Sequence, residues 1–423
     1  MQRKVKYCPS FLVIVLCIGL MFLGSIPVSA EKTYSDNNTI VLYGIFPNNG
    51  TLASVGEQAK ETFSMAIDDI NSFLVHQGSS KDVQGIISYM NSDPESALEA
   101  VKKLHEQGIT MVIGYFSSSQ LETIKDYADS EGILILSIGS SSPSLAIAGD
   151  NILRFNPDDK KQALAVDQIW SEQNISEIIP IARDDIWGHD LVKFVLHNLS
   201  KGMTMEDGIW YDPNTTTFST YLTQLDAKVG EVLKNTNAEN VTIYAVTFDE
   251  IESIMKEAAR PEYSNLTKVH WTGCDGNAFS PALTGSSDTA EFAFNHNFTT
   301  LSLGPYTDVS LDTYNALKEK LKGEPNGYTY GEYDAVWIAF ESHLIDGKND
   351  ASSLRDAITT ISNSYNGLAG ENFKNEAGDM VEGHYNQWGL VKENGEITYS
   401  NLGQVSIWNR GGDTYSVKYY PNT

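Results

Sequence analysis

The stretch that decides the fold runs from Thr110 to Leu145 and reads TMVIGYFSSSQLETIKDYADSEGILILSIGSSSPSL. Its two short apolar runs, 110–113 and 132–136, predict buried strands, and the polar segment between them has the spacing of a helix over 120–129. A strand, a helix and a second strand in this order form a unit whose two strands are parallel. Since parallel sheets are covered by helices on both faces, this stretch predicts an α/β fold.

The same alternation continues on both sides of this stretch and forms two series. In the first series we expect strands at 40–46, 85–90, 110–113 and 132–136, and helices at 55–70, 94–107 and 120–129. In the second we expect helices at 160–173, 187–199, 218–234 and 250–259, and strands at 177–182, 241–246 and 268–272. Two such series predict two doubly wound parallel-sheet lobes.

Length and composition describe a folded chain with an acidic balance. The 423 residues include 29 Lys and Arg against 55 Asp and Glu, a net charge of −26, and 41 % of the residues are hydrophobic. This apolar content excludes an intrinsically disordered chain and suffices for two lobes. The negative charge, without any run of Lys or Arg to reverse it, excludes nucleic acid and anionic membrane surfaces as expected partners.

The first thirty residues differ from the rest of the chain. Three basic residues precede an apolar run over 11–26, and small residues end at Ala30. This order is typical of a secretory signal peptide over 1–30, cleaved after Ala30. An uncleaved N-terminal anchor is the alternative, because the apolar run is almost long enough to span a bilayer. Residues 31–38 are polar and are interpreted as a tether.

Motifs for catalysis, metals or disulfides are missing from the sequence. It contains no C-x-x-C, H-E-x-x-H, G-x-x-x-x-G-K-[ST] or G-x-S-x-G. Cys8 and Cys17 belong to the expected signal peptide, so Cys274 remains alone and an internal disulfide is excluded. We therefore predict no catalytic residue, no metal and no cofactor.

Polar side chains follow the expected strands, where ligands bind in doubly wound sheets. Ser117–Ser119 follow one strand and Ser140–Ser142 follow the next, so their N–H and hydroxyl groups can meet a carboxylate. Ordinary helix capping and turns are the alternative for either serine cluster. In the second series Trp187 and Asp275 follow strands and can meet an apolar side chain and a cation, although Asp275 can equally serve the turn before Gly276.

These residues resemble the type I periplasmic binding proteins, specifically the leucine/isoleucine/valine-binding branch of ABC importers. The resemblance covers residues 38–423, and its most specific stretch is 114–145. Supporting segments are Leu52–Gly56, Asp184–Gly188, Gly273–Gly276, Tyr333–Val336, Gly370 with Phe373, and Gly378–Asp379. The resemblance implies two lobes joined by a three-segment hinge, with the ligand in the cleft between them.

The resemblance also implies a role for individual residues. Ser118 matches the residue that holds the ligand α-carboxylate, and Ser141 a hydroxyl residue that contacts both carboxylate and ammonium. The carbonyl of Gly139 is placed to accept from the ammonium, and Asp275 matches the acid that pairs with it. The residues implied near the ligand side chain are Trp187, Phe116, Thr247 and Tyr328. A zwitterion taken out of water needs such partners at each end.

Three departures from the family bear on the ligand side chain. The first loop, 47–51, is longer than usual, the frequent cysteine pair is missing, and an Asp stands at 275 where a Glu is common. The expected lobes are 39–156 with 296–386, and 157–295 with 387–423. The expected crossings between them lie near 156–160, 295–301 and 385–390.

The function implied by the resemblance is that of an extracytoplasmic substrate-binding protein at the outer face of the cell membrane. It would capture a small amino acid, branched-chain or otherwise neutral or aromatic, and deliver it as a monomer to an ABC permease. The alternative is a ligand-sensing module of a signalling system, binding an amino acid or an amide- or urea-like ligand. Neighbouring permease and ATPase genes would favour transport, and a neighbouring signalling gene would favour sensing.

Overall fold

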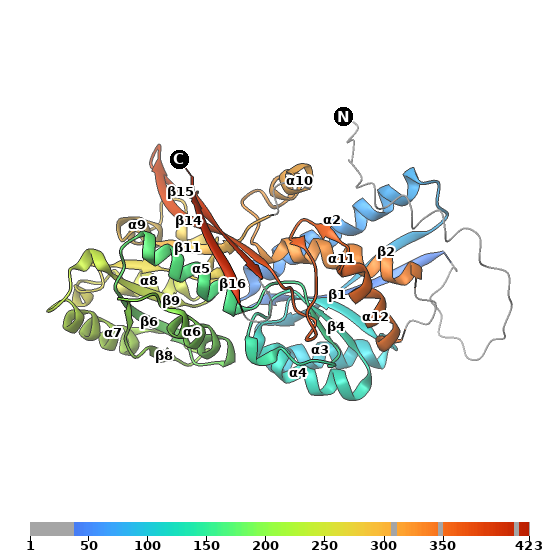
Figure 1. Cartoon of the computed structure of the whole chain (residues 1–423), viewed down its shortest axis with the longest axis horizontal. Coiled ribbons are helices and arrows are strands. Elements are labelled where there is room, and N and C mark those ends of the chain that lie inside the picture. The colour runs from blue at the N-terminus through green and yellow to red at the C-terminus, as the bar shows by residue number, and fades with distance from the viewer. Residues whose placement is uncertain (1–37, 306–310, 346–349, 410–413, 423) are drawn as a thin grey trace. The chain divides into compact units, whose positions relative to one another are not determined.

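The computed structural model describes residues 38–305, 311–345, 350–409 and 414–422 (Figure 1). The expected signal peptide, all but the last residue of the expected tether, and Cys8 and Cys17 lie outside these ranges. Cys274 is buried and free. No helix within the described ranges has the length and apolar character needed to cross a membrane.

The first lobe is built on a five-stranded sheet in the order β2-β1-β3-β4-β5. Its strands are β1 (Thr39–Asn49), β2 (Asp82–Asn91), β3 (Met111–Gly114), β4 (Leu134–Ser137) and β5 (Ile152–Arg154). The pairs β1–β3, β3–β4 and β4–β5 are parallel. Its helical segments are α2 (Ala53–His76), α3 (Pro94–Glu106), α4 (Ser118–Glu131), η1 (Pro143–Leu145), α10 (Leu311–Leu321), α11 (Tyr328–Ile345) and α12 (Ala351–Ser362).

Helix α4 shows how the deciding stretch folds locally. Ser117 caps its first turn in a capping box with Gln120, so the helix begins directly after the buried strand β3. Gly132 ends the helix at φ 70°, a left-handed conformation that favours glycine. Leu121 and Ile124 face the same hydrophobic cluster as Val112 of β3. The N-terminus of α4 therefore lies at the carboxyl edge of the first sheet.

The second lobe is built on a nine-stranded sheet with the main order β16-β15-β14-β11-β10-β9-β6-β7, in which β8 also pairs with β6. Its strands are β6 (Glu177–Arg183), β7 (Thr204–Met205), β8 (Ile209–Tyr211), β9 (Val241–Val246), β10 (His270–Thr272), β11 (Thr299–Leu303), β14 (Gly383–Glu393), β15 (Glu396–Asn409) and β16 (Tyr415–Pro421). Its helical segments are α5 (Asp159–Glu172), α6 (Ile186–Asn198), α7 (Ser219–Val232), η2 (Ala238–Asn240), α8 (Ile251–Ala258), η3 (Pro261–Tyr263), η4 (Asp275–Asn277), η5 (Pro281–Leu283) and α9 (Asp288–Asn295).

The two doubly wound lobes predicted from the sequence are confirmed, with one addition. Strands β6 to β11 pair in parallel, whereas β14, β15 and β16 extend the sheet as antiparallel strands, drawn in red tones in Figure 1. No strand was predicted beyond Thr272, so these three strands and β11 were missed. A small separate hairpin pairs β12 (Asn366–Gly367) with β13 (Gly370–Glu371).

The chain passes between the two sheets three times. The first crossing lies between β5 and α5, where it was expected. The second follows β11 and the third precedes β14, whereas the expected crossing at 295–301 ends inside β11 and the one at 385–390 falls inside β14. Strand β11 and residues 383–386 therefore pair in the second sheet, although the expected boundaries put them in the first lobe.

A buried ion pair joins two of these crossings. Arg154 at the end of β5 donates from Nε and Nη2 to the two carboxylate oxygens of Asp379, at 2.5 and 2.6 Å. Each side chain is 1 % exposed. The same guanidinium donates from Nη1 to the carbonyl of Ser142 at 2.7 Å, and the ammonium of Lys374 donates to the carbonyl of Arg154 at 2.6 Å. The charge of Asp379 is thus neutralised by a resident cation.

Candidate ligand-binding site

Asp275 lies in the short turn η4 that follows β10 at the carboxyl edge of the second sheet. Its carboxylate is buried, and Oδ2 accepts a hydrogen bond from the hydroxyl of Tyr328 at 2.7 Å. Its backbone N–H donates to Oε1 of Gln162 at 2.9 Å. The other carboxylate oxygen, Oδ1, has no hydrogen-bond partner among the described residues. Tyr328 begins α11, which packs on α2, so this acid contacts a side chain of the first lobe.

Asp159 is a second buried acid beside Asp275, and the sequence analysis missed it. It is the first residue of α5, and its Oδ1 accepts from Nε2 of Gln162 at 3.0 Å. Gln162 therefore bridges the two acids, because its other amide atom accepts from the backbone of Asp275. Within the described ranges, Oδ2 of Asp159 has no hydrogen-bond partner. Each acid thus keeps one buried oxygen free.

The electrostatics of this acid pair favour bound protons or an added cation. Burial raises the pKa of Asp275 to about 6, although the hydrogen bond from Tyr328 lowers it. Burial and the neighbouring charge of Asp275 raise the pKa of Asp159 well above its ordinary range. No ion pair joins either acid to a Lys, Arg or His in the part of the chain that the structure describes. Two buried carboxylates without a resident cation are stabilised either by a bound proton or by a positive charge from outside the described chain.

The serine clusters of the first lobe meet at the N-terminus of α4. The hydroxyl of Ser118 lies 3.0 Å from that of Ser140 and accepts from the backbone N–H of Ser142 at 3.3 Å. The carbonyl of Ser141 accepts from the backbone N–H of Asp159 at 2.9 Å, and its buried hydroxyl has no hydrogen-bond partner in the described chain. Ser141 thereby links the serine clusters to the acid pair.

Gly139 is held in place by a close aromatic neighbour. A Cβ at this position would lie 2.8 Å from the ring of Tyr115 and 2.9 Å from the carbonyl oxygen of Phe116, so only glycine fits. The ring of Tyr115 packs edge-to-face on Tyr328 with centroids 5.3 Å apart. Gly139 is thus connected through one tyrosine to the tyrosine that donates to Asp275.

Two aromatic side chains, Trp187 and Phe248, lie beside the turn that carries Asp275 and are called the aromatic wall below. Trp187 stacks on Phe248 with ring centroids 4.5 Å apart and an interplanar angle of 11°. The guanidinium of Arg183 lies 4.5 Å from the Phe248 ring centroid and makes a cation–π contact with it. A Cβ at Gly276 would approach Trp187, Phe248 and the carbonyl of Thr247 within 3.0 Å, so the turn carrying Asp275 is pressed against this wall.

The structure brings together most of the residues expected from the sequence. Asp275 and Tyr328 are hydrogen-bonded, while Trp187 and Thr247 flank the neighbouring glycine. The serine and glycine positions connect to this group through Tyr115 and Asp159, as described above. Phe116 is placed differently, because its ring belongs to the hydrophobic core of the first lobe. Its expected proximity to the ligand side chain stays a prediction.

Three contributors were missed from the sequence, namely Asp159, Gln162 and Phe248. Phe248 follows β9 at the same sheet edge as the residues that were chosen, so the rule that selected Asp275 also selects it. Asp159 and Gln162 lie in the first turn of a helix, where an acid ordinarily complements the helix dipole. Polar residues in the first turn of a helix are common, so the sequence alone does not mark Asp159 and Gln162 as site residues.

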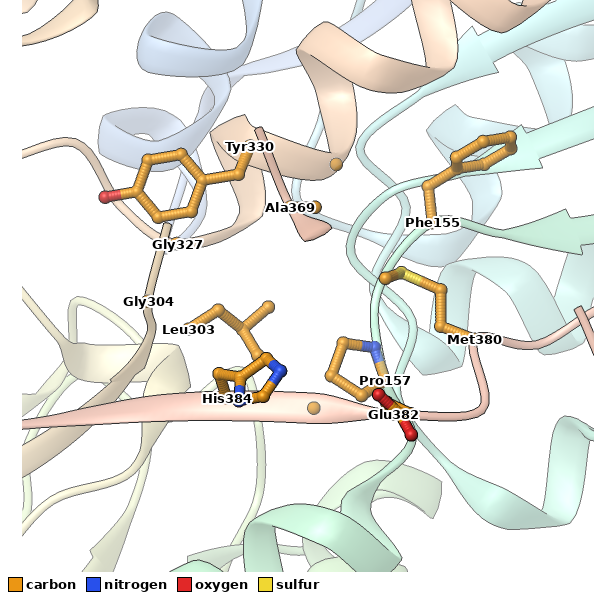
Figure 2. A pocket seen from close by; sticks show the side chains of 12 residues that line it. Phe155, Pro157, Leu303, Gly304, Gly327, Tyr330, Ala369, Met380, Glu382 and His384 are labelled. Atoms are coloured by element: carbon orange, nitrogen blue, oxygen red, sulfur yellow. The ribbon is translucent and has the colours of Figure 1, made fainter. Parts of the chain in front are cut away.

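A separate pocket lies at the crossings and is distinct from this site. Figure 2 shows Phe155 and Pro157 of the first crossing, Leu303 of β11, Met380 of the third crossing and His384 of β14 around it. None of the eight residues predicted to bind ligand lines this pocket. Within the described ranges there is also no group of three or more His, Cys, Asp or Glu that could hold a metal ion.

Comparisons with known proteins identify a family and relatives of this chain. The model of the receptor family ligand binding region matches residues 58–393. An uncharacterized protein of Methanocaldococcus jannaschii is 24 % identical over 420 residues, which cover 93 % of this chain and 96 % of that protein. The Leu/Ile/Val-binding protein of Citrobacter freundii is 29 % identical over 183 residues, 42 % of this chain, so the match spans about half (48 %) of that relative.

Solved structures show the same fold. A leucine binding protein from Thermotoga maritima superposes with a TM-score of 0.68 at 16 % identity, covering 85 % of this chain and 97 % of that one. The resemblance to type I periplasmic binding proteins stated from the sequence is confirmed by these relatives and neighbours.

Proposed function

We propose, from the premise that this chain belongs to the receptor family ligand binding region family, that it is an extracytoplasmic binding protein for a small amino acid. The family and the fold are those of solute-binding proteins. The observation that carries the proposal is the acid pair, in which Asp159 and Asp275 each keep one buried oxygen without a partner. An ammonium group has three donors and a positive charge, which match those oxygens.

The carboxylate of the ligand is assigned to the serine side of the site. Backbone N–H groups and hydroxyls at the N-terminus of α4 favour an anion, and Ser141 has a hydroxyl free for it. Since Ser141 also approaches Asp159, the two ends of an amino acid would lie on adjacent residues of the site. Recognition of both ends compensates for the water that a zwitterion loses on burial.

The side chain of the ligand is assigned to the aromatic wall. Trp187 and Phe248 offer flat apolar surface, and the nearest cation, Arg183, is already paired with Asp185 and Glu250. Arg183 is therefore not available for a second carboxylate, which favours neutral branched-chain or aromatic amino acids. The names of the matched Leu/Ile/Val-binding relatives support the same ligand class.

Delivery to an ABC permease is the biological role that we assign to the bound state. Contacts from both lobes complete the site, since Tyr328 belongs to one lobe and Asp275 to the other. Ligand therefore shifts the population toward a closed form that a permease can distinguish. A ligand-sensing role is the second candidate, and the receptor family whose model matches the chain favours it.

A thermal-shift screen of the purified chain tests the ligand class. L-Leucine, L-isoleucine, L-valine and L-phenylalanine are expected to raise the unfolding midpoint, because they bind only the folded state. Acetamide and urea, which lack an ammonium, serve as the competing ligands. Stabilisation by acetamide or urea and by none of the amino acids would overturn the proposal.

A further inference from the structure

Two direct contacts between the lobes lie beside the ligand site and use no ligand atom. The first involves Asp190 of α6, which is 6 % exposed. Its carboxylate accepts from the hydroxyl of Ser142 and, at 2.9 Å each, from the backbone N–H and the hydroxyl of Ser144. Both serines belong to the first lobe, in and before η1, whereas Asp190 belongs to the second.

The helix that carries Asp190 is docked on the first lobe by apolar contact as well. Ile186, one helical turn before Asp190, packs against the hydrophobic cluster that contains Leu145. Helix α6 also packs against α4 and η1 of the first lobe. One face of α6 therefore supplies both a polar and an apolar attachment to the other lobe.

The second contact is made by Asp249, which follows β9. Its Oδ2 accepts from the hydroxyl of Ser54 at 2.6 Å, and its backbone N–H donates to the carbonyl of Thr51 at 3.3 Å. Ser54 and Thr51 lie at the start of α2 in the first lobe. Asp249 is next to Phe248 of the aromatic wall, and Ser142 is next to Ser141, so both contacts lie directly beside residues of the site.

The partner of Asp190 is held rigidly in the first lobe. The carbonyl of Ser142 accepts from the guanidinium of Arg154, and its N–H donates to the hydroxyl of Ser118. A receiving loop that is already ordered loses little conformational entropy when Asp190 arrives. In an open form the same groups would be hydrated, so the net gain comes from charged hydrogen bonds at a partly desolvated boundary.

We infer that Asp190 and Asp249 are interlobe latches that hold the two lobes closed without ligand and thereby set the ligand affinity. A binding-competent state that is populated in advance lowers the apparent dissociation constant in proportion to its population. The latches are affinity-determining positions outside the group of residues assigned to the ligand. The inference rests on the proposed function only for its effect on affinity.

Small-angle scattering and amide hydrogen exchange of the ligand-free protein test the latches. The variants are Asp190→Asn, Asp249→Asn and both together, and Asp126→Asn on the exposed face of α4 is the matched control. The double variant is expected to have a larger radius of gyration than the parent and faster exchange at 142–146, while the control matches the parent. If Asp190→Asn fails to fold, Ser144→Ala combined with Ser54→Ala removes one hydroxyl donor to each aspartate from the other lobe.

The outcomes separate the latches from the ligand class. With L-leucine as the probe, the double variant is expected to bind about tenfold more weakly or worse. Unchanged dimensions and unchanged exchange of the ligand-free double variant would overturn the latches, whatever its affinity. If L-leucine does not bind the parent chain, the proposed ligand class is wrong. The measurements on the ligand-free protein still test whether Asp190 and Asp249 hold the lobes closed.

Discussion

Two groups of buried carboxylates differ in whether a cation of the protein pairs with them. Asp379 at the third crossing is held by the guanidinium of Arg154 through two hydrogen bonds. Asp159 and Asp275 are equally buried, yet each keeps an oxygen without a partner in the described chain. A buried charge that the fold itself neutralises is structural, whereas one that the fold leaves without a cation awaits a ligand or a proton.

The largest expected effect comes from the crossing. Asp379→Ala leaves Arg154 buried and unpaired, so we expect the unfolding free energy to fall by about 3–5 kcal/mol. Urea unfolding of the ligand-free protein measures this loss, and Asp126→Ala at the surface is the control. An unchanged urea midpoint for Asp379→Ala would show that the ion pair with Arg154 does not stabilise the fold.

The next largest effect is expected for Asp275, whose substitution should weaken ligand binding and leave stability intact, the reverse of Asp379→Ala. Asp275→Asn keeps an acceptor for Tyr328 and removes a buried charge, so we expect unchanged or higher stability of the ligand-free protein. Binding of L-leucine should weaken by about 3 kcal/mol, roughly 100-fold, because the ammonium loses its charged partner. Calorimetry on the same variant used for unfolding gives both values. A destabilised variant with unchanged affinity would make Asp275 structural, like Asp379.

Asp159→Asn tests how the two acids of the pair share the binding of the ammonium group. Asparagine retains an oxygen for Gln162, and removal of one like charge lowers the pKa of the remaining acid. We expect L-leucine affinity to fall by about 1–2 kcal/mol, less than for Asp275→Asn, since one carboxylate remains. Equal affinity for this variant and the parent would exclude Asp159 from the ammonium site.

The smallest effect is that of pH, and its sign distinguishes the two groups. Burial raises the pKa of Asp275 to about 6, so the folded ligand-free protein holds more protons than the unfolded chain between about pH 4 and 6. Its stability from this group therefore falls as pH rises through that window. Ligand binding shows the reverse, because an ammonium prefers the ionised acids, so affinity should rise by up to about tenfold. Affinity measured at pH 5 and pH 7 checks this sign.

Much of the fold could be predicted from the sequence because its signals are local. The apolar runs of β3 and β4 and the capping serine of α4 fix the parallel unit within 36 residues, Thr110 to Leu145. The antiparallel strands β14, β15 and β16 were missed because they carry mixed polar and apolar residues and follow a helical region. Their place in the second sheet depends on pairing with β11, which no local pattern reveals.

The site could be predicted only where residues follow strands. Asp275 and Trp187 were found by that rule, whereas Asp159 looks like any acid in the first turn of a helix. Its role depends on Gln162 and Asp275, and the backbone of Asp275 is 113 residues from Gln162 in the chain. The same distance argument applies to Arg154 and Asp379, 225 residues apart. Contacts of this range are a property of the folded chain.

We propose that the free oxygens of Asp159 and Asp275 receive the ammonium group of the ligand. The most direct measurement is calorimetric titration of the purified chain with L-leucine and with N-acetyl-L-leucine, which share a side chain and a carboxylate but differ in the ammonium. We expect L-leucine to bind and the acetylated form to bind at least 100-fold more weakly. Equal or tighter binding of N-acetyl-L-leucine would contradict it.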